Sequence, residues 1–200
     1  MRLGLLYSGG KDSSLAALLL DRFYEVTLVT AHFDVTGDWR NAQAAADTLG
    51  FDFTTLELDQ DVAYSAIETM REDGYPRNGI EAVHRHALGR IATDEDLDFA
   101  VIADGTRRDD RVPTVSRAQA QTLENRHDVD YIAPLSGFGR RAVDRLANDA
   151  LDVTVGPSDE IKKADYESEL RALLAEEFGE DAVRDVFPEH TQTFVEGLRD

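Results

Sequence analysis

The sequence predicts an α/β protein built on a doubly wound parallel sheet, and three observations support this fold class. Strand-like and helix-like segments alternate along most of the 200 residues, the order expected when helices cover both faces of a parallel sheet. Two strand-like segments, VTLVTAHF at 26–33 and FAVIAD at 99–104, are largely apolar, as expected for strands buried on both faces. The first strand-like segment passes into a helix through a glycine turn, SGGKD at 8–12. Ligands of such folds bind beyond the carboxyl ends of the strands, where the strand order reverses.

The individual elements follow from the apolar pattern. Apolar runs predict strands at Arg2–Tyr7, Glu25–Phe33, Asp52–Leu58, Phe99–Asp104 and Asp130–Leu135. Helical spacing of apolar residues predicts helices at Asp12–Phe23, Asp38–Leu49, Gln60–Asp73, Ile80–Thr93, Thr114–Arg126 and Arg140–Ala150. A glycine-containing break, GYPRNG at 74–79, separates two of these helices, and a polar loop, GTRRDDRVP at 105–113, follows the fourth strand.

The C-terminal part has a different pattern. Residues 164–178 (ADYESELRALLAEEF) carry apolar side chains at helical spacing, and we expect a second, shorter helix at 190–198. The sequence therefore predicts a nucleotide-binding type of domain at 1–155 and a C-terminal helical extension at 156–200 that packs on it.

Composition excludes several classes of protein. The chain has no cysteine, so it forms no disulfide, thiolate metal site or cysteine nucleophile of its own. It has no apolar run of 18 residues, so we expect no membrane span. The strand-like segment begins directly after Met1, so we expect no leader peptide and a cytoplasmic location.

The net charge of −19 and the small number of lysines are typical of halophilic proteins. There are three lysines (Lys11, Lys162 and Lys163) beside 18 arginines and 40 acidic residues. Concentrated salt screens the self-repulsion of such a surface. An ordinary acidic mesophilic protein is the alternative.

Arginines are concentrated in the middle third of the chain. Residues 71–146 carry 12 basic and 14 acidic side chains, whereas residues 1–70 carry 4 and 11, and residues 147–200 carry 5 and 15. An anionic partner such as RNA would therefore bind most readily to the middle third. Arginine is also common on solvated helices, so this clustering has an ordinary structural explanation as well.

The glycine turn is a phosphate-binding candidate. It lacks the opening glycine and the Ser or Thr after lysine of a Walker A loop, and it lacks the third glycine of G-x-G-x-x-G. Gly9 and Gly10 allow a close approach of phosphate to the backbone, and the following helix N-terminus favours an anion. Lys11 would contact phosphate. Asp12 would repel it unless Mg²⁺ bridges the two, and Asp12 could otherwise cap the helix.

The turn resembles the PP-loop of the N-type ATP pyrophosphatases, S-G-G-x-D-S. Matching positions are Ser8, Gly9, Gly10, Asp12 and Ser13, with Ser14 as a common additional serine. The resemblance implies a Rossmann-like fold of the adenine nucleotide alpha hydrolase type. It also implies that ATP, with Mg²⁺, is cleaved to AMP and pyrophosphate while an acceptor is adenylylated.

Later segments are similar to further elements of this family. In IADGTRRDD (102–110), the resemblance implies that Asp104, Gly105 and Thr106 face the triphosphate and that Asp109 or Asp110 completes a metal site with Asp12. Arg107 would stabilise phosphate charge. The expected catalytic residues are thus Lys11, Asp12, Asp104 and Arg107. The alternative is that this segment is an ordinary solvated loop.

The end of the second strand lies where the family binds adenine through the backbone, which implies contacts at Ala31, His32 and Phe33; His32 could equally be a packing residue. His84 and His86 lie two positions apart on a predicted helix, so a shared metal is not expected. The segment around them could instead touch substrate phosphate.

The chain is most similar to small archaeal PP-loop proteins described as predicted tRNA-thiolation-related subunits, through DGTRRDDRVP, DYESELR and FPEHTQTFVEG. This resemblance implies that a tRNA base is the acceptor, bound through the arginine-rich residues 71–146. Without cysteine, the sulfur or nitrogen must come from a partner protein or a free small molecule. A homodimer is compatible with the sequence. An adenylylating ligase or amidase acting on a small molecule, and a non-enzymatic nucleotide sensor, remain alternatives.

Overall fold

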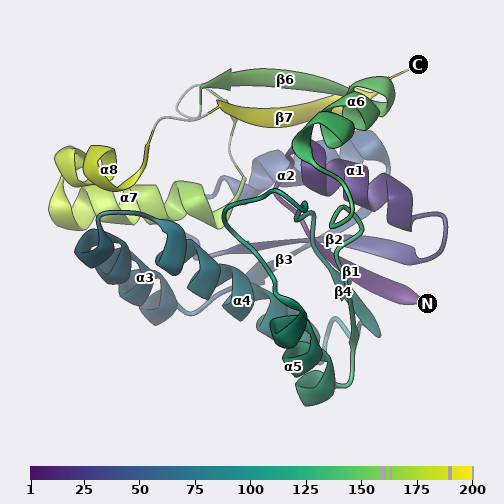
Figure 1. Ribbon diagram of the computed structural model, residues 1–200, viewed down its shortest axis with the longest axis horizontal. Coiled ribbons are helices and arrows are strands. Elements are labelled where there is room, and N and C mark those ends of the chain that lie inside the picture. Colours follow the sequence, from purple (N-terminus) through teal and green to yellow (C-terminus); the bar gives the residue numbers. More distant parts are fainter. Residues whose placement is uncertain (158–160, 163, 189–190, 200) are drawn as a thin grey trace.

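The computed structural model describes residues 1–157, 161–162, 164–188 and 191–199. A parallel sheet of five strands, in the order β3-β2-β1-β4-β5, forms its centre. These strands are β1 (Arg2–Leu6), β2 (Glu25–His32), β3 (Asp52–Glu57), β4 (Val101–Ala103) and β5 (Asp130–Ile132). From β1 the chain moves outward to β3 and then returns to the other side of β1, so the strand order reverses between β1 and β4 (Figure 1). This confirms the predicted doubly wound α/β fold.

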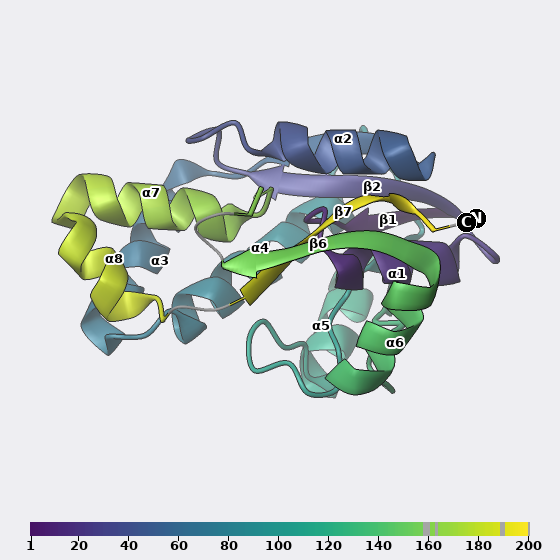
Figure 2. The same ribbon diagram turned by 90° about the horizontal axis from the view of Figure 1, so that it is seen from above.

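Helices cover both faces of the sheet (Figures 1 and 2). On one face lie α1 (Lys11–Leu20), α2 (Trp39–Leu49) and α6 (Arg140–Ala150). On the other lie α3 (Gln60–Asp73), α4 (Arg77–Thr93) and α7 (Tyr166–Phe178), with α5 (Arg117–His127) beside α4 and α8 (Glu180–Val186) after α7. Leu28 packs into the core of the first face, and its neighbour Val29 packs into the core of the second. The strands are therefore buried on both faces, as their apolar runs predict.

Most predicted elements agree with the structure to within a few residues at each end. The bounds of α3 and α6 are those predicted. The fourth and fifth strands are shorter than predicted, because the chain leaves the sheet after Ala103 and Ile132. Helix α8 was not predicted.

The helix predicted at 190–198 is wrong. Residues Thr191–Leu198 form a strand, β7, which pairs antiparallel with β6 (Leu151–Pro157), a strand that was not predicted. Thr191, Thr193 and Val195 are β-branched, which favours a strand. The partner strand lies some forty residues earlier in the chain, so local periodicity does not show the pairing.

The two-stranded ribbon β6–β7 packs on α1 and α2 (Figure 2). Phe194 and Val195 are buried in the core of this face. Strand β6 crosses the domain boundary expected between residues 155 and 156. The nitrogen of Val195 donates to the carbonyl of Gly9 over 3.0 Å, so β7 is bonded directly to the glycine turn.

No helix in the described part of the chain is long and apolar enough to cross a membrane.

Candidate functional site

The glycine turn joins β1 to α1 at the carboxyl end of the central strand. Gly9 has a φ of 73°, in the left-handed region, and a Cβ at this position would lie 3.2 Å from the Phe194 ring. Gly10 is the N-cap residue of α1 and has no side chain with which to cap the helix. The amide of Lys11 donates to Thr193 Oγ1 over 3.3 Å. A helix N-terminus that follows a glycine turn is suited to binding an anion.

The three serines of the turn take different positions. Ser8 and Ser13 lie at the cavities described below, with their hydroxyl oxygens 3.3 Å apart. Ser14, in contrast, is fully buried and its hydroxyl bonds that of Tyr7 over 3.0 Å. Burial raises the pKa of Tyr7 to about 12, and the bond to Ser14 lowers it only in part. The structure therefore brings Ser8 and Ser13 to the site, whereas the predicted ligand Ser14 points into the core.

A cavity of about 440 Å³ opens beside the turn. Four cationic side chains line it: Lys11, Arg107, Arg140 and Lys162. Two of the three lysines of the whole chain thus border one cavity. Thr193 of β7 and Gly10 of the turn complete the adjoining wall. In a chain of net charge −19, such a concentration of positive charge marks a site for an anion.

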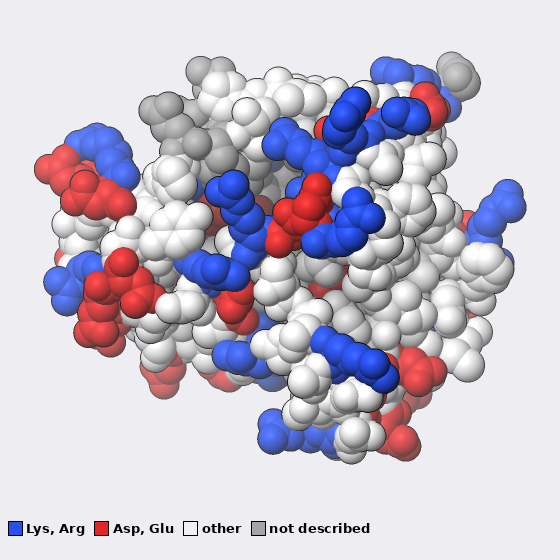
Figure 3. Space-filling view, in the orientation of Figure 1, with Lys and Arg blue, Asp and Glu red and all other residues white. Residues whose placement is uncertain are grey.

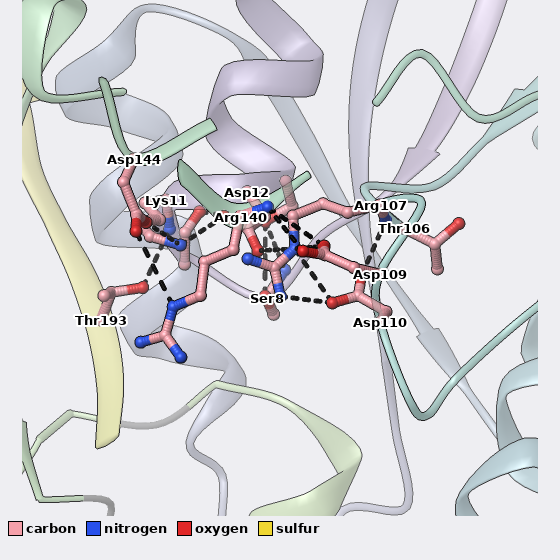
Figure 4. A network of polar contacts seen from close by, with 12 residues as sticks. Ser8, Lys11, Asp12, Thr106, Arg107, Asp109, Asp110, Arg140, Asp144 and Thr193 are labelled. Atoms are coloured by element: carbon pink, nitrogen blue, oxygen red, sulfur yellow. Dashed lines mark hydrogen bonds and ion pairs between the residues drawn. The ribbon is translucent and has the colours of Figure 1, made fainter. Parts of the chain in front are cut away.

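Carboxylates from three segments pair with three of these cations, Lys11, Arg107 and Arg140 (Figure 4). Lys11 Nζ lies 2.6 Å from Asp12 and 3.2 Å from Asp144 of α6. Arg107 Nε lies 3.2 Å from the other Asp12 oxygen and bonds Asp110 over 2.9 Å. Partial burial by itself would lower the pKa of Arg107, but Asp110 and Asp12 raise it above its usual value. Arg107 therefore stays charged and is held in place beside the cavity.

The metal residues predicted from the resemblance lie on either side of Arg107. Asp12 contacts its guanidinium, and Asp109 lies at 4.0 Å from it. Asp109 also accepts the backbone N–H of Arg140 over 2.9 Å, which lowers the pKa of this carboxyl. No group of three or more metal-ligating side chains occurs within the described residues. The donor set fits Mg²⁺ only as an ion that arrives with a nucleotide, since Mg²⁺ commonly takes one or two carboxylates and completes its shell with phosphates and water.

A smaller cavity, of about 220 Å³, adjoins the first. Both cavities are bordered by Ser8, Asp12, Ser13 and Asp165. The walls of the smaller one combine apolar and aromatic groups with polar and acidic ones: Tyr7, Ala31, Ile80, His84, Asp104, Thr106, Asp110, Val112, Pro113, Tyr166 and Glu167. An anion-binding cavity therefore joins a partly apolar one at the switch point of the sheet, where nucleotides bind in such folds.

The loop after β4 packs closely on the glycine turn. A Cβ at Gly105 would lie 2.9 Å from the backbone nitrogen of Ser13, so glycine is required for this approach. Thr106 lines the smaller cavity, and Arg107 lines the larger one. The structure thus brings the predicted residues 104–107 to the site.

Asp104, however, is buried, and both oxygens of its carboxylate already accept hydrogen bonds from the protein. Its carboxylate accepts hydrogen bonds from His84 Nε2 (2.8 Å), Tyr131 Oη (2.9 Å) and both the backbone and hydroxyl of Thr106 (2.9 and 2.7 Å). Burial would raise the pKa of Asp104, but the hydrogen bonds from His84 and Thr106 hold it below its usual value. His84 Nδ1 is 2.8 Å from the hydroxyl of Tyr166, which lines the cavity. If Nε2 donates to the carboxylate, Nδ1 accepts from Tyr166. Asp104 is therefore placed to position His84 and Tyr166 rather than to contact phosphate.

The three residues expected to bind adenine lie in different surroundings. Ala31 lines the smaller cavity. His32 stacks on Trp39, with ring centroids 5.8 Å apart, and its Nδ1 accepts the backbone N–H of Asp34. Phe33 is fully buried, and its backbone N–H donates to Glu169 of α7. Only Ala31 is thus brought to the cavity.

Several site residues were not predicted from the sequence. These are Lys162, Arg140, Asp144 and Thr193, which border the larger cavity. His84 borders the smaller cavity and lies in the segment that the sequence suggested as a possible phosphate contact. The rarity of lysine was a signal for Lys162. The role of Thr193 depends on β7, whose pairing the sequence pattern did not show.

Comparison with known proteins identifies the family. The family model described as a family of unknown function, DUF7411, matches residues 1–197. An uncharacterised protein of Methanocaldococcus jannaschii is 40% identical over 200 residues, which cover 100% of this chain and 97% of the relative.

A solved structure shows the same fold over the whole chain. The crystal structure described as a predicted subunit of tRNA methyltransferase from Methanocaldococcus jannaschii is 38% identical, with a TM-score of 0.89, over 100% of this chain and 98% of that one. A U34-tRNA thiolase, NcsA, from Methanococcus maripaludis is 20% identical with a TM-score of 0.48, over 74% of this chain and 56% of that one. The predicted similarity to archaeal proteins described in connection with tRNA modification is therefore confirmed, although the nearly full-length match is described as a methyltransferase subunit. By the extent of the family match and the 40% identity, the chain belongs to the DUF7411 family.

Proposed function

We propose that the protein binds ATP and transfers its adenylyl group to an acceptor, with a tRNA base as the acceptor. One observation carries this proposal: the glycine turn and the N-terminus of α1 border both a cavity lined by four cationic side chains and a partly apolar cavity next to it. The larger cavity suits the phosphates of a nucleotide, and the smaller one suits its nucleoside or the acceptor.

In this reaction, an acceptor oxygen attacks the α-phosphorus, the bond between the α- and β-phosphates breaks, and pyrophosphate leaves with the electron pair. The amides of the turn and the side chains of Lys11 and Lys162 would bind the β- and γ-phosphates. Arg107 would stabilise the charge that develops in the transition state. Catalysis then rests on orientation and charge stabilisation.

Lys11 changes partners in this mechanism. In the structure it is paired with Asp12 and Asp144. Phosphate oxygens would replace these carboxylates as its partners. Mg²⁺, held by Asp12 and Asp109 together with the phosphates, would neutralise the leaving pyrophosphate.

The adenylylated base would then be attacked by a sulfur or nitrogen nucleophile, with release of AMP. Because the sequence has no cysteine, the nucleophile comes from a partner protein or from free sulfide or ammonia. Such a reaction fits a cytoplasmic protein, and the acidic, lysine-poor composition fits a cytoplasm with a high salt concentration.

The test is an assay of pyrophosphate release from ATP with the purified protein in molar KCl. Unmodified tRNA transcripts are expected to stimulate release, and Lys11→Ala is expected to abolish it. Stimulation by a small carboxylic acid or amide, but not by tRNA, would identify a small-molecule ligase instead. Binding of ATP without release in the presence of either acceptor class would indicate a nucleotide sensor.

A further inference from the structure

A cavity outside the candidate site lies between α4 and α5. Its volume of about 610 Å³ exceeds that of either cavity of the site and falls in the usual range for ligand pockets. Helix α5 contributes no fully buried residue to the core. It rests beside α4 at the edge of the molecule (Figure 1). The cavity between the two helices, the α4–α5 groove, is lined by residues of both.

The α4–α5 groove is lined by positive charge. The charged and titratable residues around it are Arg85, Arg90, Arg126, His84, His86, His127 and Glu81. Only one of these is acidic, although the chain has 40 acidic and 21 basic residues. Figure 3 shows basic side chains over α5 at the bottom of the view, with acidic side chains to one side of them. This concentration of positive charge favours an anionic occupant.

Two of the three arginines of the groove, Arg85 and Arg126, have no charged or hydrogen-bonding partner among the described residues. Arg90 lies 3.5 Å from Asp59, which therefore offsets its charge. Arg85 and Arg126 are exposed, and neither forms an ion pair or hydrogen bond with a described residue. Their guanidinium groups are available for a phosphate, which arginine binds well.

The floor of the groove is apolar and open. Leu88, Val115, Ala118 and Leu123 contribute to its lining. Gly89 lies in the interior of α4, and no atom lies within 4 Å of the position that its Cβ would take. Glycine in a helix interior is less stable than alanine, and no packing contact in the described chain requires it here. An open apolar floor between free guanidinium groups suits a base with its backbone phosphate better than it suits an inorganic anion.

The groove also adjoins the candidate site. His84 lines both the α4–α5 groove and the smaller cavity beside the glycine turn. A chain molecule in the groove would therefore end next to the position proposed for the adenylyl transfer.

We infer that the α4–α5 groove binds single-stranded RNA of the acceptor, with backbone phosphates at Arg85 and Arg126 and a base against the floor at Gly89. A single strand is favoured because an unpaired base can enter such a groove, whereas side chains cannot read the narrow major groove of an RNA duplex. This inference rests on the proposed function, because it names where the acceptor binds.

The test measures RNA and ATP binding separately. Fluorescence anisotropy with a labelled tRNA transcript and a labelled single-stranded RNA of about 12 nucleotides is recorded over a series of KCl concentrations. The variants are R85A/R126A, the charge-matched control R22A/R184A, whose arginines lie after α1 and on α8, and G89L, which fills the groove without changing charge. Equilibrium dialysis gives ATP affinity, and thermal melting shows that each variant is folded.

For R85A/R126A we expect RNA affinity to fall at least about tenfold and the slope of log affinity against log salt to fall by about 1.4, or about 0.7 for each lost single-strand phosphate contact. G89L should weaken RNA binding with an unchanged or higher melting temperature. The control should bind RNA within about twofold of the wild type, and all variants should bind ATP as the wild type does.

If R85A/R126A and the control bind RNA equally well while the wild type binds ATP, the RNA site in the α4–α5 groove is wrong. The proposed function would still stand in that case. RNA binding that depends on Arg85 and Arg126 without any ATP binding would support the groove and contradict the proposed function. If AMP binds in a manner that requires these arginines while RNA does not, the occupant is a free nucleotide and the RNA assignment is wrong.

Discussion

Glu169 Oε2 lies 2.6 Å from the backbone nitrogen of Phe33, and this contact ties helix α7 to the end of β2. The second oxygen of the same carboxylate accepts the backbone N–H of Val35 over 2.9 Å. Glu169 is only 2% exposed. A buried carboxylate thus satisfies two amides at the point where the chain leaves the central sheet.

Replacing Glu169 with alanine should destabilise the fold strongly. Two backbone amides would lose their acceptor, at a cost of about 1–3 kcal/mol each when they are buried. We expect the free energy of unfolding to fall by about 2–5 kcal/mol in urea denaturation. Glu177→Ala, on the exposed part of the same helix, is the control and should change stability by less than about 0.5 kcal/mol. Equal effects of the two substitutions would show that the contact contributes nothing.

Gly9→Ala should impair both folding and nucleotide binding. Gly9 and Gly50 have left-handed φ values of 73° and 77°, but only the Cβ at position 9 would meet neighbouring atoms. Gly50→Ala therefore isolates the backbone cost, about 1 kcal/mol, and Gly9→Ala should cost more. Isothermal titration with ATP should show binding lost for Gly9→Ala and retained for Gly50→Ala. Retention of ATP binding by both would exclude the turn as the phosphate site.

Lys162→Ala should weaken binding of ATP and pyrophosphate without altering the fold. Lys162 borders the same cavity as Lys11, and a hydrogen bond to a charged group contributes about 1.5–3 kcal/mol, or roughly 10- to 100-fold in affinity. Lys162→Arg should restore most of the affinity. Arg184→Ala, remote on α8, is a control for net charge. Unchanged affinity of Lys162→Ala would remove this lysine from the site.

Asp104 should make stability depend on pH below about 4. Its pKa is lower in the folded protein than the usual 3.8. The stabilisation from its charge is therefore present above the unfolded-state pKa and is lost as the pH falls through the folded-state pKa. Urea denaturation between pH 7 and pH 2.5 should show the wild type losing its advantage over Asp104→Asn in the acidic range. Asp130→Asn, at an exposed position, serves as the control, and a stability difference that stays constant across this range would contradict the assignment.

The sequence predicted those features that depend on local pattern. Alternating units and apolar strands predicted the sheet, and the residues from Ser8 to Ser13 predicted a phosphate-binding turn at the switch point. Long-range contacts were not accessible in this way. The hydroxyl of Ser14 turns to Tyr7 because both lie beneath the turn, and Phe33 is engaged by a carboxylate 136 residues later. Thr193 reaches the cavity because β7 pairs with β6 and bonds the turn. Lys162 also contacts this strand, with its ammonium over the Phe194 ring.

The bond from β7 to the glycine turn joins positions almost at opposite ends of the sequence, since Thr193 receives the Lys11 amide across 182 residues. During synthesis on the ribosome, the central sheet can assemble long before residues 191–198 emerge. Until then, a nascent chain lacks one wall of the cavity at the turn. If the cavity binds a polyphosphate as proposed, its full affinity would therefore arise only after this strand has been added and has docked on the turn.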